Sequence, residues 1–280
     1  MRISSRRLRL AGGVALVSTL MTAPWVHADE PSAVSVELQG TYGAASGRPP
    51  RGLCGLDPPA SQIRYGGVGA RVRLRPKVPS LGPNRGPEVV AMGAVEHHSF
   101  TLLAPGEEGS REVPSDQPLA GASLSAGYGW SDFGLRVGVT AFQQIAQSTR
   151  GCPSASAAVT PCVARTEYRP AALNLLPELH LRFGSIDSVV LELGWGAYSV
   201  GTVLRPGVFL AVRGELPKGW AALLGFGGHF SPLEYFHARG DLAVHIPVHR
   251  HVRLIAGGAL SGGEGTRVEP EGRLGAELRF

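Results

Sequence analysis

Apolar and polar residues alternate along most of this 280-residue chain. Successive side chains of a β-strand point to opposite faces, so alternation predicts strands with one apolar and one polar face. In segment 236–248, for example, Leu242 and Val244 share one face, and Asp241 and His245 share the other. The chain contains no run of 18 apolar residues of the kind that predicts a membrane-spanning helix.

The alternation predicts twelve strands, an even number of the kind that single-chain bacterial barrels have. We expect them at 33–42, 63–75, 88–100, 119–130, 133–145, 168–183, 189–199, 204–215, 219–230, 236–248, 251–260 and 273–280. Each is close to the ~9–11 residues that a tilted transmembrane strand needs. The pairs Val89-Val90 and His97-His98 blur the phase of the third strand, and ten or fourteen strands remain alternatives.

The connections between these strands alternate in length. Links 43–62, 103–118 and 146–167 are long, whereas links 130–132, 184–188, 216–218 and 249–250 are tight. Short turns at one end and long loops at the other are typical of outer-membrane barrels, with the short turns in the periplasm. The long Pro/Gly-rich link 76–87 is an exception on the short side.

The sequence therefore predicts an all-β fold, a transmembrane antiparallel up-and-down β-barrel with apolar residues outside. A soluble β-sandwich or lipocalin-like barrel would bury the apolar face instead, and alternation alone does not separate the two. The tight turns, the aromatic last residue and the export signal described next favour the membrane barrel.

Residues 1–28 have the features of a cleaved secretory signal peptide. Four arginines (Arg2, Arg6, Arg7 and Arg9) precede an apolar stretch, and Val26-His27-Ala28 forms a small-x-small cleavage site. We expect residues 29–280 to form a single barrel domain. The chain has 27 basic and 22 acidic residues, and removal of the four arginines leaves 23 against 22. This balance gives no reason to expect a nucleic-acid partner.

The final strand ends on a terminal aromatic residue. Arg273, Gly275, Leu278 and Phe280 match the pattern polar, any, glycine, any, any, hydrophobic, any, terminal aromatic. This segment resembles the C-terminal insertion signal of bacterial outer-membrane β-barrel proteins. The resemblance implies an outer-membrane location in a Gram-negative-type bacterium and contact with membrane lipid. It also implies handling by periplasmic chaperones and insertion by the barrel-assembly machinery, but it indicates no subfamily.

The polar face of the strands predicts a charged lumen. Its expected lining is Arg71, Arg73, Arg136, Glu178, His180, Arg182, Glu192, Arg213, Arg239, Asp241, His245 and Arg253. Arginines gather toward the periplasmic half, so we expect a weak preference for anions if the lumen is open. Phe133, Phe183, Trp220 and Phe280 have outward parity at the periplasmic ends of strands and predict an aromatic girdle.

Three cysteines, Cys54, Cys152 and Cys162, lie in the long links. An exported protein meets an oxidising compartment, so a disulfide is expected; Cys152–Cys162 is the local choice, and the other pairings stay open. The spacing of cysteines and histidines predicts no metal site, since His97 and His98 would point to opposite faces. We expect no cofactor.

Three classes of function follow, in order of preference. The first is a porin-like passive channel for small solutes, or a structural barrel with a filled, charged lumen. The second is binding or adhesion through the long external loops. The third is a lipid-modifying enzyme, which we do not expect, because no catalytic constellation surrounds Asn84, Asn174, His229 or Ser231.

Overall fold

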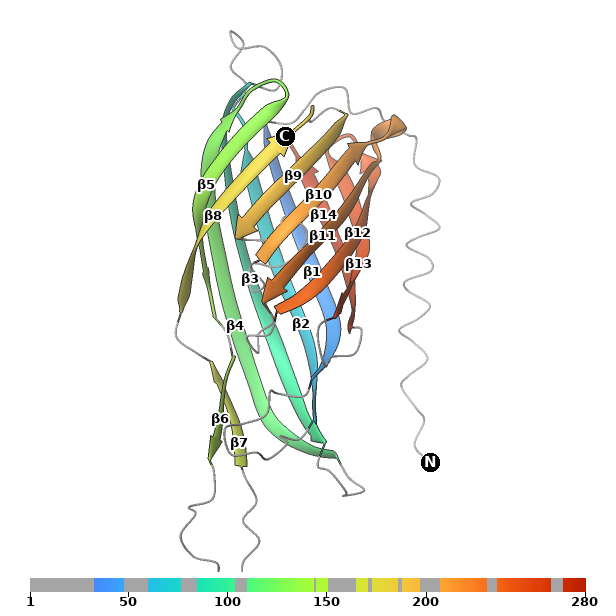
Figure 1. The fold of residues 1–280 in the computed structure, drawn as a ribbon. Helices are drawn as coiled ribbons and strands as arrows, with labels where there is room; N and C mark the ends of the chain where they lie inside the picture. The colour runs from blue at the N-terminus through green and yellow to red at the C-terminus, as the bar shows by residue number, and fades with distance from the viewer. Residues whose placement is uncertain are drawn as a thin grey trace, which may run out of the picture.

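The structure, a computed structural model, shows a closed barrel of antiparallel strands (Figure 1). It describes residues 33–47, 60–76, 85–103, 110–143, 145–150, 165–170, 173–185, 188–196, 207–230, 236–262 and 269–280. Around the wall the twelve strands follow the order β1-β14-β13-β12-β11-β10-β9-β8-β5-β4-β3-β2. The predicted fold class and strand number are confirmed.

The strand bounds lie close to those that the alternation predicts. The barrel strands are β1 (Val34–Gly47), β2 (Ala60–Leu74), β3 (Gly86–Leu103), β4 (Ser110–Gly129), β5 (Phe133–Phe142), β8 (Asn174–Phe183), β9 (Val189–Gly196), β10 (Gly207–Glu215), β11 (Ala221–Phe230), β12 (Phe236–His249), β13 (Val252–Gly262) and β14 (Glu269–Arg279). Two further strands, β6 (Ile145–Arg150) and β7 (Arg165–Pro170), pair only with each other.

The first and last strands close the barrel. The amide of Val34 donates to the carbonyl of Phe280 at 3.1 Å, and the amide of Phe280 donates back to Val34 at 2.9 Å. From there β1 and β14 stay in register, with Glu37 opposite Glu277. Because this seam pairs both strands, neither leaves an open edge in the wall.

The tight connections lie at one end of the barrel, which we call the turn end; the opposite end is the loop end. The turn end also holds Phe280, at the top of Figure 1. There the 3-10 turn η2 (Pro217–Gly219) joins β10 to β11, with Lys218 and Gly219 at φ values of 62° and 76°. Residues 250–251 join β12 to β13. By the sequence argument above, the turn end is expected to face the periplasm.

At the loop end, several strands extend beyond the predicted bounds. The expected link 103–118 is mostly strand, since β3 runs to Leu103 and β4 begins at Ser110. The expected link 146–167 contains most of β6 and the start of β7, and the predicted strand 133–145 ends at Phe142. Backbone amides and carbonyls pair between neighbouring strands whether or not side chains alternate, so hydropathy underestimates these lengths.

Some predictions fall outside the described residues. These are the signal peptide at 1–28, the three cysteines Cys54, Cys152 and Cys162, and most of the link 76–87. In the part of the chain that the structure describes, no helix is both long and apolar enough to cross a membrane.

Candidate functional site in the barrel lumen

The two faces of the barrel wall differ sharply in chemistry. Large apolar side chains cover the outside, among them Leu274, Leu175 and Val68, which are 71%, 69% and 68% exposed. Charged side chains fill the inside, and most of them are nearly buried. A closed wall that is apolar outside and polar inside suits a lipid bilayer, because lipid contacts only the outer face.

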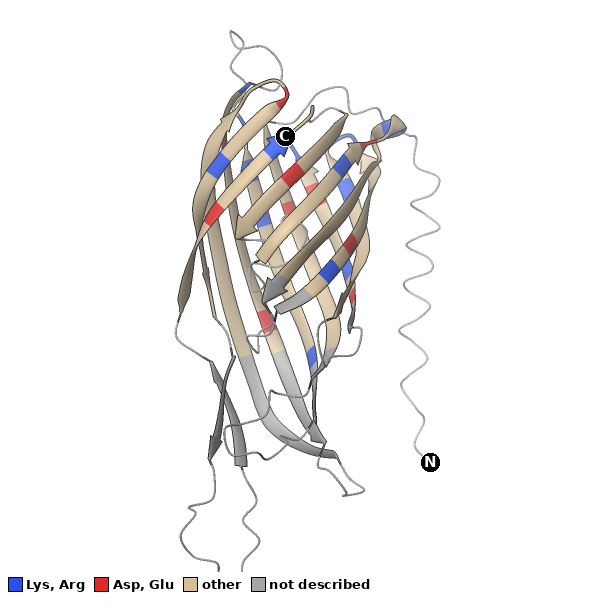
Figure 2. Ribbon diagram, viewed as in Figure 1, with Lys and Arg blue, Asp and Glu red and all other residues tan. Residues whose placement is uncertain are grey.

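Every residue of the predicted lining faces the lumen. All except Arg73 and Arg213 are buried, and those two are partly buried while bonded to other lumen residues. In the described chain the lumen carries ten arginines, Arg71, Arg73, Arg75, Arg136, Arg182, Arg213, Arg239, Arg253, Arg273 and Arg279. It carries nine acidic residues, Glu37, Glu88, Glu96, Glu178, Glu192, Glu215, Asp241, Glu271 and Glu277. The lumen is therefore nearly balanced in charge, and Figure 2 shows most of these residues in the half toward the turn end.

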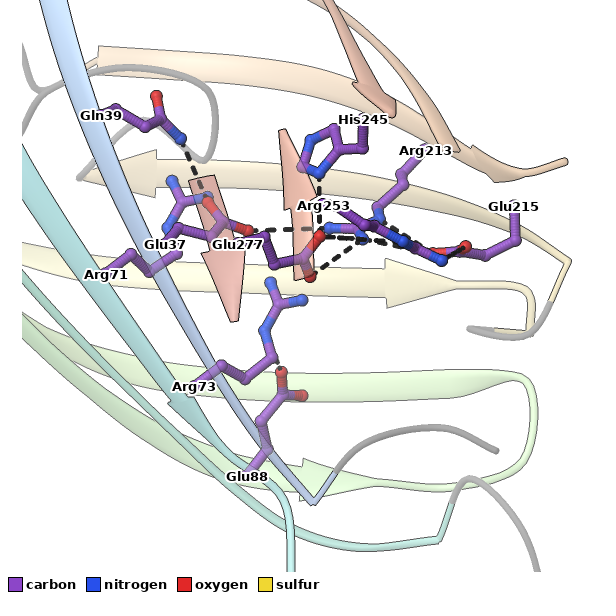
Figure 3. Close-up of polar contacts among 10 residues, drawn as sticks. All are labelled: Glu37, Gln39, Arg71, Arg73, Glu88, Arg213, Glu215, His245, Arg253 and Glu277. Atoms are coloured by element: carbon purple, nitrogen blue, oxygen red, sulfur yellow. Dashed lines mark hydrogen bonds and ion pairs between the residues drawn. The ribbon is translucent and has the colours of Figure 1, made fainter. Parts of the chain in front are cut away.

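Six of these residues, together with His245, form what we call the cross-lumen network, which Figure 3 shows in close-up. Its members are Glu37, Arg71, Arg213, Glu215, His245, Arg253 and Glu277. They come from β1, β2, β10, β12, β13 and β14. Side chains from widely separated parts of the wall therefore meet near one level of the lumen.

Arg213 is the centre of the cross-lumen network. Its guanidinium lies 3.8 Å from a carboxylate oxygen of Glu37, 3.2 Å from Glu215 and 3.4 Å from Glu277. Going round the wall through β14, β13, β12 and β11, β10 is the fifth strand from β1. The Arg213–Glu37 contact therefore joins nearly opposite walls of a twelve-stranded barrel.

The other members of the network hold these carboxylates in place. Arg71 donates to Glu37 at 3.1 Å, and Arg253 donates to Glu215 at 2.7 Å. His245 bonds Glu277 through Nδ1 at 2.9 Å. Buried charges are tolerated when they are paired and hydrogen-bonded, and each carboxylate here has at least two cationic or histidine partners.

A second group, which we call the arginine cluster, lies beside the network at the turn end. It comprises Arg73, Arg75, Arg136 and Arg182 around Glu88 and Glu192. Arg73 and Arg75 each lie 3.2 Å from the same oxygen of Glu88, and Arg136 lies 3.8 Å from it. Arg136 also donates to Glu192 at 2.6 Å. One carboxylate is thus shared by several guanidinium groups.

His180 connects the arginine cluster to the middle of the lumen. Its two ring nitrogens lie 3.0 Å from Glu192 and 3.1 Å from Glu178, and Glu178 also accepts a hydrogen bond from Thr140. Glu178 therefore bonds a hydroxyl group and a histidine, and it also interacts with Arg136 of the arginine cluster.

A third group lies closer to the loop end and consists of two arginines and two acidic residues. Arg239 and Arg273 each contact both Asp241 and Glu271, at distances between 2.7 and 3.1 Å. Tyr65 adds a hydrogen bond from its hydroxyl to Glu271 at 3.0 Å. The contributing strands β12 and β14 flank β13, where Gly257 and Ala259 are small enough to let the longer side chains meet.

The sequence analysis missed several acidic partners. Glu88 was not assigned to the lumen because Val89-Val90 obscures the alternation of its strand. In the structure it faces the lumen together with Arg73 and Arg136. Glu271 precedes the expected start of the last strand at 273, and β14 in fact begins at Glu269. Glu215 is the last residue of the strand that carries Arg213. The two residues are two positions apart and therefore share a face, which is the signal that identifies Glu215.

The predicted aromatic residues lie near the turn end. Phe133 stacks between Trp130 and Phe183 with ring centroids 5.5 Å apart on each side, and Tyr128 extends the group. Phe280 is 64% exposed and stacks on His251. Trp220 follows η2 and is partly buried. A belt of this kind fits a membrane interface, and its role as a girdle stays a prediction.

Other predicted features are only partly described. His97 is exposed and has outward parity, whereas the side chains of His98 and His229 are not among those described. Within the described residues, no group of three or more His, Cys, Asp and Glu side chains is arranged to hold a metal ion.

No protein-family model matches the chain, and neither does any curated protein. Solved structures match it in fold. The β domain of the Bordetella autotransporter BrkA aligns over 88% of this chain and 100% of its own, with TM-score 0.51 and 14% identity. The translocator domain of the autotransporter NalP from Neisseria meningitidis aligns over 96% of both chains, with TM-score 0.50 and 11% identity. An outer-membrane channel from Pseudomonas putida F1 covers 90% of this chain and 96% of its own, with TM-score 0.50 and 10% identity.

Fold and wall chemistry together define the class. The chain has the fold of bacterial outer-membrane β-barrels, as its C-terminal residues predicted. The apolar outer band and the charged interior suit the outer membrane, the location that the sequence indicates.

Proposed function

We propose that this protein is a passive outer-membrane channel for small solutes, constricted by the cross-lumen network. The observation that carries the proposal is the contact of Arg213 with both Glu37 and Glu277 across the lumen. Among the described residues, side chains form this constriction. It therefore restricts the size and charge of a solute while leaving the barrel wall unchanged.

The burial of the network argues for a narrow path. The side chains of Glu37, Arg253 and Glu277 are only 3–4% exposed, and those of Arg213 and Glu215 are 18% exposed. An open aqueous pore would wet these charges. Passage therefore requires that Arg213 swing away from its partners, which a long, flexible side chain can do at the cost of its ion pairs.

The fold likeness to the Pseudomonas putida channel is compatible with this role, and at 10% identity it supports the fold alone. We propose a passive rather than a catalytic role, because most charged side chains of the described lumen are occupied in ion pairs and hydrogen bonds with one another.

Solute entry into liposomes tests this role. Liposomes that contain the refolded barrel should admit a small neutral sugar slowly, and Arg213→Gln should admit it several-fold faster, because glutamine no longer bridges to Glu37. Arg213→Lys retains the charge with a shorter reach and should give an intermediate rate. Swelling measured by light scattering reports these rates, and heat-modifiable electrophoretic mobility verifies folding.

Arg250→Gln is the matched control, since Arg250 is exposed in the β12–β13 turn at the same end of the barrel. It should leave permeation unchanged. The proposal fails if the wild-type barrel admits the sugar as fast as Arg213→Gln does. It fails equally if no folded variant admits any solute.

A further inference from the structure

The arginine cluster contains a buried cation whose hydrogen-bonding groups are unused. Arg182 is 7% exposed, and none of its three guanidinium nitrogens has a hydrogen-bond partner among the residues that the structure describes. Nη1 of Arg136 and Nε of Arg73 also lack a well-formed hydrogen bond, but they lie 3.8 Å and 3.2 Å from the same oxygen of Glu88. The three nitrogens of Arg182 are thus left over beside arginines that share one carboxylate.

The same group carries an excess of positive charge. The charged neighbours of Arg182 are Glu88, Arg73, Arg136 and Glu192, and Arg75 also lies close by. Four arginines surround two glutamates, so positive charges outnumber negative ones in this group. Glu178, the next carboxylate along the lumen, bonds Thr140 and His180 and also interacts with Arg136.

The backbone makes room for this arrangement. Arg182 pairs across the strands with Gly134, and a Cβ at Gly134 would lie 2.8 Å from Nε of Arg182. The guanidinium therefore occupies the space that a side chain on β5 would fill. Burying an unpaired cation is costly, so a site that places one beside three further arginines is expected to take up an anion.

We propose that the arginine cluster is a binding site for a phosphate-type dianion inside the lumen. A dianion offsets an excess of positive charge more fully than a singly charged carboxylate does. The four oxygens of a phosphate also offer more acceptor sites to the spare N–H groups than a planar carboxylate does. Arginine is well suited to this group because its planar fork binds phosphate through two parallel hydrogen bonds.

The ligand reaches this site from solution rather than from the bilayer. The side chains that flank Arg182 in β8, Leu181 and Phe183, have outward parity and face lipid, so Arg182 itself faces the lumen. Arg73 and Arg75 are 22% and 15% exposed and lie at the turn end, so water reaches part of the cluster there. The site is independent of conduction, because a lumen can bind an anion whether or not it passes one.

Calorimetric titration of the folded barrel in neutral detergent micelles with inorganic phosphate at pH 8 tests this site. We expect saturable binding to the wild type, and binding at least tenfold weaker to Arg182→Gln, which loses several charge-assisted hydrogen bonds. Sulfate should bind in the same way, whereas acetate should bind more weakly. Arg182→Gln should fold readily, because it removes an unpaired buried charge. Arg75→Gln serves as a second variant, and we expect it to lose less phosphate affinity than Arg182→Gln does.

Arg250→Gln is again the control, since it removes one positive charge from the turn end outside the lumen and should retain wild-type binding. The site is refuted if chloride at the same ionic strength reproduces the phosphate signal, or if Arg182→Gln binds phosphate as well as the wild type does. An anionic phospholipid mixed into the micelle should not compete with phosphate, and competition would contradict the placement in the lumen.

Discussion

At the scale of single residues, glycines inside the barrel let large side chains lie across a neighbouring strand. Tyr65 on β2 passes over Gly43 on β1 to reach Glu271 on β14. A Cβ at Gly43 would lie 2.3 Å from the tyrosine ring and from its hydroxyl. Phe209 lies over Gly194 in the same way, with a Cβ there 2.3 Å from the ring.

This packing predicts that Gly43→Ala destabilises the barrel. The methyl group would displace the rigid Tyr65 ring and break its hydrogen bond to Glu271, so the free energy of unfolding should fall by about 1–3 kcal/mol. Gly40→Ala is the control in the same strand, because the nearest atoms to a Cβ there are 3.8 Å away. Urea unfolding in detergent micelles measures both, and equal midpoints for the two variants would contradict the role given to Gly43.

The sequence predicts which residues face the lumen but not which of them meet. A two-residue period is enough to assign Arg213 and Asp241 to the inner face. The partner of Arg213 across the lumen, Glu37, depends on strand order around the closed wall, which no local pattern encodes. The unpaired state of Arg182 is likewise a property of the assembled barrel.

At the scale of elements, the sequence predicts the twelve wall strands because each must present an apolar face to lipid. It fails at the loop end, where β3, β4, β6 and β7 continue through segments without regular alternation. There the strands pair through their backbones, and this pairing leaves no hydropathy signal.

The β6–β7 hairpin lies outside the barrel wall, so the wall should form without it. Phe142 of β5 pairs directly with Asn174 of β8, and a two-residue Asn-Gly turn in place of 143–173 can therefore join the two strands. This deletion also removes Cys152 and Cys162, and with them the predicted local disulfide.

We expect the shortened protein to refold and to keep heat-modifiable mobility on electrophoresis. Circular dichroism should show the same cooperative thermal transition as the full-length barrel. A chain that stays unfolded under conditions in which the full-length protein folds would show that the hairpin is part of the folding unit.

At the scale of the whole molecule, the barrel separates apolar and charged chemistry across one wall. Outward residues such as Leu242 and Leu274 face lipid, and the lumen charges pair with each other in three groups. The cross-lumen network and the group around Arg239 and Arg273 are close to charge balance. The arginine cluster carries the excess positive charge, so any preference for anions is expected to originate there.

Single-channel conductance of the refolded wild-type barrel in a planar lipid bilayer tests the constricted lumen most directly. The account predicts brief, small conductance steps, with a reversal potential that indicates a weak preference for anions. Large, long-lived steps would contradict it, because they require an open path past Arg213 and Glu37, and a folded barrel without any steps would contradict the channel itself.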